Sequence, residues 1–255
     1  MTISFLGEDY LEIRDLSVDF DGFKAIDGVD VDLRQGRLHF LIGPNGAGKT
    51  TLVDALTGLV HGTGTAEFRN HNLLEMKSHK IVRLGIGRTF QTATVFEQLS
   101  VLQNLDIAAG LHRKPLSLLR ARRSVPESVE AALETIGLTA HAHRPAGILA
   151  HGQKQWLEVG MLLVQDAQVM FLDETVAGMS TEEREETGAL LQRIVGDRTI
   201  VIIEHDMEFM RTFADFVTVM HGGKVLAEGT VAEIQADPQV QEVYLGTVTE
   251  VAAHD

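Results

Sequence analysis

A short glycine-rich segment near the start of the chain has the spacing of a phosphate-binding loop. Gly43-Pro44-Asn45-Gly46-Ala47-Gly48-Lys49-Thr50 fits the pattern G-x-x-x-x-G-K-[ST]. Glycines let the backbone approach an anion closely, and the N–H groups of the loop and of the following helix face the phosphates. We expect Lys49 to reach the β- and γ-phosphates and the Thr50 hydroxyl to hold Mg²⁺, with Thr51 opening the helix. The pattern predicts a nucleotide site.

Two adjacent carboxylates later in the chain complement this loop. The apolar run at residues 169–172 is followed directly by Asp173 and Glu174. At the end of a strand beside the loop, Asp173 could hold Mg²⁺, directly or through water. Glu174, one residue further on, could polarise a water for attack on the γ-phosphate. The pair therefore predicts hydrolysis of the bound nucleotide.

Short apolar runs indicate the strands that must position these groups. The runs at residues 38–42, 169–172 and 199–203 are typical of parallel strands covered on both faces. Alternating runs at residues 11–18 and 29–33 indicate half-buried antiparallel strands. Residues 63–68 read as a further strand, and residues 216–227 as a hairpin around two glycines.

Helical spacing dominates the middle of the chain, where Val129, Leu133 and Ile136 fall on one face. The sequence therefore predicts an α/β fold, with a RecA-like parallel-sheet core around a P-loop, an antiparallel β subdomain and a helical insertion. The expected division is a core with the β subdomain at residues 1–91 and 166–240, a helical subdomain at residues 92–165, and a tail at residues 241–255.

Composition narrows the function classes. The chain has 255 residues, 44% of them hydrophobic, no cysteine and a net charge of −14. The negative charge argues against a nucleic-acid partner. No apolar run approaches the ~20 residues that a membrane span needs, and the N-terminus has no signal-peptide pattern. A cytoplasmic location is expected.

A further segment precedes the two carboxylates by one short helix. It reads Leu149-Ala150-His151-Gly152-Gln153-Lys154-Gln155-Trp156-Leu157-Glu158. The N-terminus of this helix is a second anion site, free to serve the nucleotide of another molecule. Because this segment lies one short helix before Asp173 and Glu174, the chain resembles the ATP-binding cassette (ABC) transporter family. The family signature Leu-Ser-Gly-Gly-Gln is matched at Leu149, Gly152 and Gln153, so the resemblance assigns Ala150, His151, Gly152 and Gln153 to a partner's nucleotide.

Other motifs of the family follow in order over residues 10–246. Gln91 matches the glutamine that reaches Mg²⁺ and the attacking water, and His205 matches the switch histidine that contacts the γ-phosphate. Phe20 matches the aromatic that stacks on adenine; Phe23 competes for this role, and a plain core aromatic is the other alternative. The resemblance implies ATP and Mg²⁺ as cofactors.

Four residues depart from the family pattern. Ala150 replaces the signature serine, His151 replaces a glycine, Thr175 stands at the usual proline, and Ser180 at the usual aspartate. A hydrogen bond to a charged group contributes about 1.5–3 kcal/mol, so the lost serine hydroxyl bears on the partner's site. The phosphate loop, Asp173 and Glu174 are unaffected.

Two stretches, residues 87–97 and 149–158, resemble the subfamily that serves importers of branched-chain amino acids, and most of all its urea-uptake branch. Residues 204–210 and 243–246 point the same way. We therefore expect an ATPase subunit of a urea importer, with branched-chain amino acids or amides as the alternative. The resemblance implies permease subunits, contacted by residues 92–100, a second ATP-binding subunit in a heterodimer or homodimer, and an extracytoplasmic binding protein. It places the chain peripherally on the inner face of the cell membrane.

Two other classes remain as alternatives. A soluble, non-transport ABC ATPase usually carries two cassettes or a long coiled coil, and this chain has a single phosphate loop. A small-molecule kinase needs an acceptor pocket and lacks a signature segment before its carboxylates. Phosphate transfer to something other than water would reveal a kinase.

Overall fold

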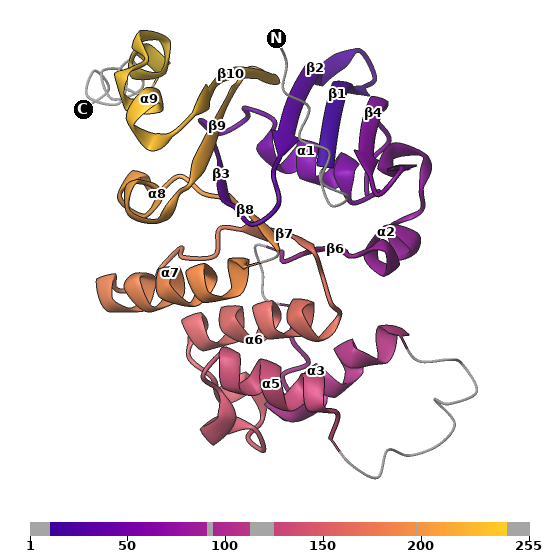
Figure 1. Ribbon diagram of the computed structural model, residues 1–255, viewed down its shortest axis with the longest axis vertical. Coiled ribbons are helices and arrows are strands. Elements are labelled where there is room, and N and C mark those ends of the chain that lie inside the picture. The colour runs from indigo at the N-terminus through magenta and orange to yellow at the C-terminus, as the bar shows by residue number, and fades with distance from the viewer. Residues whose placement is uncertain (1–10, 91–93, 113–124, 197, 244–255) are drawn as a thin grey trace.

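The computed structural model describes residues 11–90, 94–112, 125–196 and 198–243 (Figure 1). The strands are β1 Leu11–Phe20, β2 Phe23–Leu33, β3 Leu38–Ile42, β4 Thr63–Phe68, β5 His71–Asn72, β6 Ile86–Arg88, β7 Val169–Asp173, β8 Thr199–Ile203, β9 Phe216–His221 and β10 Lys224–Gly229. The helices are α1 Lys49–Leu56, α2 Ser78–Leu84, α3 Val101–Ala108, α5 Glu127–Thr135, α6 His151–Val164, α7 Thr181–Val195, α8 Met207–Phe213 and α9 Val231–Ala236.

A six-stranded sheet forms the centre, in the order β10-β9-β3-β8-β7-β6 (Figure 1). Every neighbouring pair from β9 to β6 is parallel, and β10 joins antiparallel at the edge. The residues of β3, β7 and β8 are all buried, which is why these strands read as continuous apolar runs. The predicted hairpin is β9–β10.

A second sheet of four antiparallel strands, in the order β2-β1-β4-β5, stands beside the first. β1 and β2 show the predicted alternation of buried and exposed residues. Their buried side chains pack with α1 and with one face of the central sheet, where Leu41, Phe171 and Val201 lie. Helix α1 is therefore enclosed between the two sheets.

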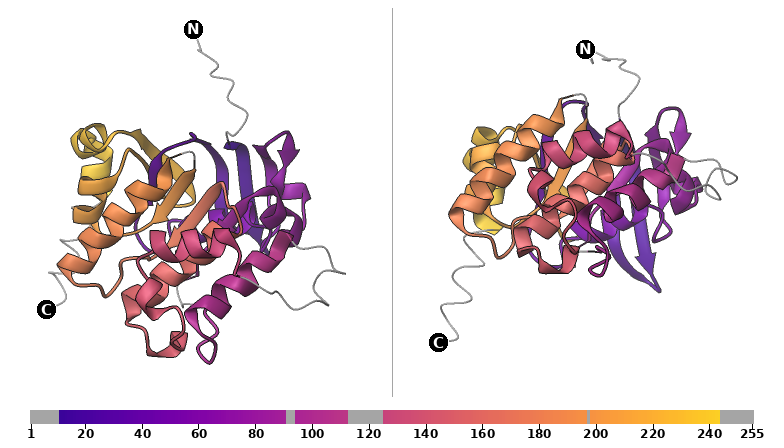
Figure 2. Two further views of the ribbon diagram at one scale, coloured as in Figure 1. Left: turned by 60° about the horizontal axis from the view of Figure 1, so that its bottom comes forward. Right: turned by 90° about the horizontal axis from the view of Figure 1, so that it is seen from below.

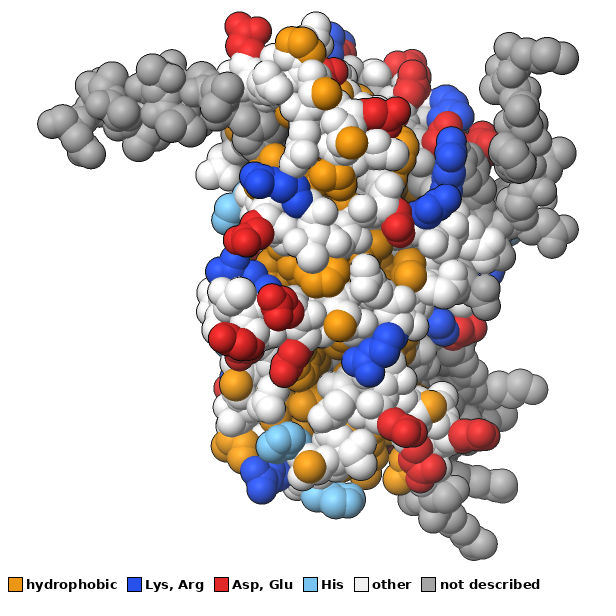
Figure 3. Space-filling model, turned by 60° about the vertical axis from the view of Figure 1, so that its left-hand side comes forward, with side chains coloured by type: hydrophobic (Ala, Val, Ile, Leu, Met, Phe, Trp, Pro, Cys, Tyr) orange, Lys and Arg blue, Asp and Glu red, His pale blue; other side chains and the backbone are white. Residues whose placement is uncertain are grey.

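The opposite face of the central sheet is covered by helices. Phe40, Leu172 and Ile202 point to this side, and they pack with residues of α6, α7, α8 and α9. Successive residues of a strand alternate between its faces, so β3, β7 and β8 contribute to both cores. Figure 3 shows part of the outer surface, where acidic and basic side chains are interspersed with small apolar areas.

The middle of the chain folds into a small helical bundle of α3, α5 and α6, which stays together in every view (Figures 1 and 2). Val129, Leu133 and Ile136 are buried in its own core, on one face as predicted. The bundle lies between β6 and β7 in sequence. None of the described helices has the length and apolar character needed to cross a membrane.

Candidate functional site

The strand order brings three predicted motifs to one edge of the central sheet. β8 lies between β3 and β7, and Ile203 is in register with Leu41 on one side and Asp173 on the other. The phosphate loop follows β3, Glu174 follows β7, and His205 follows β8. The carboxyl ends of these parallel strands therefore gather the loop, Asp173, Glu174 and His205, as the apolar runs had indicated.

The phosphate loop is shaped by two tightly packed glycines. A Cβ on Gly43 would lie 2.2 Å from the carbonyl oxygen of Met220, and one on Gly48 would lie 2.8 Å from that of Ala25. Gly48 also has φ +100°, a left-handed conformation that favours glycine. By contrast, nothing lies within 4 Å of a Cβ placed on Gly46. The loop therefore packs against neighbouring backbone at Gly43 and Gly48 and is open at Gly46, where there is room for an anion.

Lys49 begins α1, and its ammonium group folds back over the loop. Nζ donates hydrogen bonds to the carbonyl oxygens of Gly43 at 2.7 Å and Pro44 at 3.1 Å. Burial lowers the pKa of Lys49, while the charges of Asp173 and Glu174 oppose this shift. The first turn of α1 has no acidic residue and no side-chain cap, so its N–H groups are available to an anion. These features fit the phosphates of a nucleotide.

Asp173 is almost fully buried at the end of β7. Burial raises the pKa of its carboxyl group, and the nearby Arg88 guanidinium lowers it. Among the described residues, no group of three or more His, Cys, Asp or Glu could hold a metal. One carboxylate and the Thr50 hydroxyl fit Mg²⁺, which usually takes its other ligands from substrate phosphates and water. Gln91, the third expected ligand, lies outside the described residues.

Glu174 adopts an uncommon backbone conformation. Its φ is +49°, in the left-handed region that non-glycine residues seldom occupy. Its N–H donates to the carbonyl oxygen of Ile203 at 3.0 Å, which ties the end of β7 to the end of β8. Strained residues of this kind cluster at functional sites. The half-buried side chain leaves the sheet edge with a carboxylate that water can reach.

The loop after β8 contains a buried carboxylate that the sequence interpretation missed. The Glu204 side chain is 1% exposed, whereas the neighbouring His205 side chain is 71% exposed. Glu204 accepts hydrogen bonds from the backbone N–H groups of Val176 at 3.0 Å and His205 at 3.3 Å. Burial raises the pKa of Glu204. An acidic residue at the end of an apolar run is the signal that could have identified it, as it did for Asp173.

Arg88 is a second group that the sequence interpretation did not single out. Its guanidinium forms an ion pair with Asp54 of α1 and lies 3.8 Å from the carboxylate of Asp173. It also lies 4.6 Å from the centre of the Phe90 ring. Arg88 thereby joins α1, β7 and the segment that leads to Gln91. The sequence gives little signal for this contact, because Asp54 and Asp173 are far from it in the chain.

The two aromatic candidates for adenine stacking face each other across the β1–β2 hairpin. Phe20 and Phe23 are paired in register and are 48% and 69% exposed, which argues against a plain core role for either. The same hairpin adjoins the phosphate loop, because Gly223 donates to Ala47 and accepts from Asp27 of β2. Both rings are therefore exposed on a hairpin that is connected to the loop through Gly223.

The signature segment lies apart from these groups. Ala150 and His151 are exposed where α6 begins, and Gln153 accepts the N–H of Ala150 at 3.2 Å. Helices α6 and α1 pack on opposite faces of the central sheet, and no hydrogen bond of the described residues joins the segment to the phosphate loop. Gly152 instead abuts Met179, because an added Cβ would lie 3.4 Å from its Cε.

Two of the departures from the family pattern have clear structural settings. Ser180 caps α7: its hydroxyl accepts the N–H of Glu183, whose carboxylate accepts the N–H of Ser180 in return. Thr175 is fully buried, and its hydroxyl oxygen has no hydrogen-bond partner within the described structure.

Known proteins match the chain over most of its length. The family model described as ABC transporter matches residues 26–177, more than half of the chain. A second model, described as branched-chain amino acid ATP-binding cassette transporter, matches residues 224–249.

Two curated relatives are ATP-binding proteins of high-affinity branched-chain amino acid transport. LivG of Salmonella typhimurium is 36% identical, with 94% of this chain and 99% of that protein covered. BraF of Pseudomonas aeruginosa is 34% identical, with 92% and 97% covered.

Solved structures of ABC transporter cassettes are also similar to this chain. The ADP conformation of MJ1267, an ATP-binding cassette of an ABC transporter, has a TM-score of 0.81 and 29% identity, with 93% of this chain and 99% of that chain covered. The cbiO1 protein of Clostridium perfringens, part of the ABC transporter complex cbiONQ, has a TM-score of 0.77 and 27% identity, with 96% and 99% covered. These neighbours confirm the predicted fold class. The chain belongs to the ABC transporter family and is an ATP-binding, ATP-hydrolysing subunit of a transporter.

Proposed function

We propose that the chain powers an importer of branched-chain amino acids. The match of residues 224–249 to the branched-chain amino acid cassette model carries this proposal, together with the relatives LivG and BraF. From the sequence alone, we expected urea as the solute, with branched-chain amino acids or amides as the alternative. The named relatives support the second reading and give no support to urea.

The phosphate loop, Gly43 to Thr51, binds ATP in this proposal. Lys49 exchanges its bonds to two loop carbonyls for bonds to the β- and γ-phosphates, because a phosphate is the stronger acceptor for an ammonium group. Thr50, Asp173 and Gln91 would hold Mg²⁺, and the bound ion would neutralise the charge that develops on the phosphates. Phe20 supplies the stacking surface for adenine, with Phe23 as its competitor.

Glu174 orients the attacking water, and its position at the sheet edge beside Lys49 supports this role. His205 contacts the γ-phosphate, and its exposed ring leaves it free to do so. Gln91 senses the same phosphate from the segment after β6. Catalysis in this reaction class comes mainly from positioning and charge stabilisation, so these three groups act by geometry.

A second ATP-binding subunit completes the site. Ala150, His151, Gly152 and Gln153 lie away from this chain's own loop, which supports a role toward the nucleotide of a partner. The pair is a heterodimer, or a homodimer in isolation, beneath permease subunits on the inner face of the membrane. Residues 92–100 contact the permease, and an extracytoplasmic binding protein delivers the solute.

Solute uptake tests the proposal. Cells that lack this gene are compared with cells that carry the wild-type gene or the Glu174→Gln variant, using labelled leucine and labelled urea side by side. We expect loss of leucine uptake alone, restored by the wild type and not by the variant. Loss of urea uptake alone would return the assignment to urea, and loss of neither would refute both.

A further inference from the structure

The loop that carries His205 is joined to the segment after Glu174 by a buried carboxylate. One oxygen of Glu204 accepts the N–H of Val176, and the other accepts the N–H of His205. The same oxygen lies 3.8 Å from Nδ1 of the His205 ring. A single buried carboxylate thus connects the backbone of residue 176 to that of residue 205.

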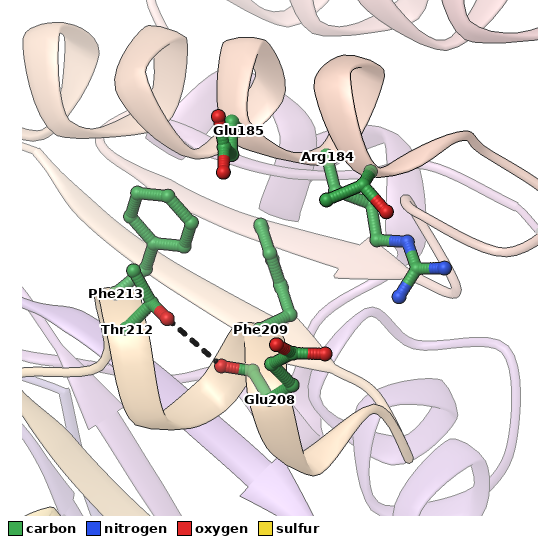
Figure 4. Close-up of a pocket in the computed structure, with 7 residues that line it drawn as sticks. Arg184, Glu185, Glu208, Phe209, Thr212 and Phe213 are labelled. Carbon is green, nitrogen blue, oxygen red and sulfur yellow. Dashed lines mark hydrogen bonds between the residues drawn. The ribbon is translucent and has the colours of Figure 1, made fainter.

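A second connection joins the same two segments further along the chain. The Arg184 guanidinium pairs with Asp206 at 2.6 Å and donates to the carbonyl oxygen of Met179 at 3.3 Å. Asp206 also caps α8 by accepting the N–H groups of Glu208 and Phe209. Figure 4 shows Arg184 projecting from α7 toward the end of α8 that carries Glu208 and Phe209.

The two connections differ in strength. Glu204 is buried, and hydrogen bonds that involve a charged group in a low-dielectric interior are about twice as strong as neutral ones. The side chains of Arg184 and Asp206 are 34% and 23% exposed, so water weakens their pair. Glu204 should therefore dominate the coupling between the two loops.

The partner-facing signature helix reaches the same segment. Gly152 of α6 packs against Met179, and the Trp156 indole donates to the hydroxyl of Thr187 at 2.9 Å. Thr187 in turn contacts the sulfur of Met179 at 3.4 Å. Residues 175–180 thus lie between the start of α6 and the loop that carries His205.

We propose that Glu204 is a positioning residue that makes residues 175–180 and the His205 loop move as one unit. Docking of the second ATP-binding subunit against the exposed residues 178 and 180 then sets the position of His205 over the γ-phosphate. This inference rests on the proposed role of His205 and adds a coupling residue that touches neither nucleotide nor metal. Arg184 and Asp206 support the same coupling as the weaker connection.

The isosteric variant Glu204→Gln tests the coupling in the assembled transporter. A glutamine keeps one oxygen acceptor but replaces the other with an NH₂ group, which cannot accept an N–H. Glu228 offers a control of the same residue type, because its carboxylate also accepts a hydrogen bond, from Thr218 at 2.6 Å, but it is exposed and lies on the edge strand β10. We expect Glu204→Gln to lower kcat about 10- to 100-fold with the KM for ATP within about twofold, and Glu228→Gln to leave both unchanged.

Amide hydrogen exchange, measured with and without ATP, distinguishes a coupling role for Glu204 from a purely structural one. In the wild type, ATP should slow exchange in residues 175–180 and 205–209 together. In Glu204→Gln, the two segments should respond separately. Wild-type kcat with a joint response in this variant would overturn the proposal.

A second variant covers the case in which Glu204→Gln fails to fold. Arg184→Gln changes a partly exposed side chain, and we expect a fall in kcat of about two- to fivefold, against no change for Arg193→Gln on the same helix. Equal kcat in these two variants would contradict the coupling. Loss of turnover in Glu174→Gln together with no effect at Glu204 or Arg184 would reject only this inference, whereas normal turnover in Glu174→Gln would reject the proposed site itself.

Discussion

The two ends of the central sheet hold their polar side chains in different ways. At the carboxyl ends of β3, β7 and β8, Lys49, Glu174 and His205 are bonded to backbone or exposed. On the side where β3 and β9 begin, the buried His39 ring contacts the Thr218 hydroxyl at 2.8 Å, and that hydroxyl donates to Glu228. In this second set, the polar side chains make hydrogen bonds to one another across paired strands.

This difference suits one end of the sheet to ligand binding and the other end to stabilising the fold. The His39, Thr218 and Glu228 side chains come from β3, β9 and β10, which are hydrogen-bonded neighbours and hold the three groups in fixed geometry. The other edge, which we propose is catalytic, instead holds Lys49 at the start of α1 and Glu174 and His205 in loops, where an arriving nucleotide can reach them. We therefore expect substitutions at the catalytic edge to change turnover and those near His39 to change stability.

Glu174→Gln should give the largest effect. The amide cannot accept a proton from water, so we expect ATP turnover to fall about 10²–10⁴-fold while ATP still binds. Turnover is measured as phosphate release, and ATP binding by a fluorescent analogue. Glu228→Gln is the control, with near wild-type turnover. If Glu174→Gln kept normal activity, the contrast between the two ends would fail.

His39→Gln should remove a pH dependence of stability. Burial lowers the pKa of His39 from 6.5 to about 3, so the folded protein holds this ring neutral where the unfolded chain binds a proton. Stability from this site is complete above pH 6.5 and is lost as pH falls toward 3, because the unfolded state binds more protons there.

Glutamine stays neutral at every pH, so the contribution of His39 appears as the difference between the two proteins. We expect the wild type to lose about 3 kcal/mol more than His39→Gln between pH 7 and pH 4. The measurement is urea unfolding at both pH values, with phosphate release at pH 7 as the activity check. Parallel losses in the two proteins would show that His39 is not held neutral.

Lys49→Ala should weaken ATP binding. The ammonium group bonds two carbonyls of the phosphate loop, and a hydrogen bond to a charged group contributes about 1.5–3 kcal/mol, which corresponds to a 10- to 100-fold rise in Kd. Equilibrium titration with ATP measures this change. Lys80→Ala, on the exposed side of α2, is the control. An equal Kd for the two variants would remove Lys49 from the site.

The smallest effect should distinguish Phe20 from Phe23. Aromatic stacking contributes about 0.5–1.5 kcal/mol, so we expect Phe20→Ala to raise the Kd for ATP about two- to tenfold. Phe23→Ala should change it less than twofold, although its ring is the more exposed of the two. The reverse result would assign the stacking role to Phe23.

The sequence predicted those parts of the site that lie within short motifs. Gly43 to Thr50 and the Asp173-Glu174 pair were recognisable because a loop or a strand end needs only neighbouring residues. The strands at residues 38–42, 169–172 and 199–203 were equally clear, since full burial demands apolar side chains on both faces. The transported solute did not follow from such motifs: the sequence favoured urea, whereas the named relatives serve branched-chain amino acid transport.

Contacts between distant segments were not predictable in the same way. Glu204 reaches Val176 across 28 positions, Arg88 reaches Asp54 across 34, and Arg184 reaches Asp206 across 22. No local spacing encodes such pairs. The Glu204 and Arg184 contacts form because β7 and β8 are adjacent in the sheet, and the Arg88 contact forms because α1 packs on the sheet face that includes β6.

The sequence alone therefore predicts which residues could bind phosphate, hold a metal and activate water, because those abilities belong to side-chain types in short patterns. The tertiary structure alone decided that β8 lies between β3 and β7, and so which loops meet at one edge. It also decided that Glu204 is buried between two loops while Glu228 is fixed among paired strands. Burial and partnership depend on long-range packing, which gives chemically identical carboxylates different roles.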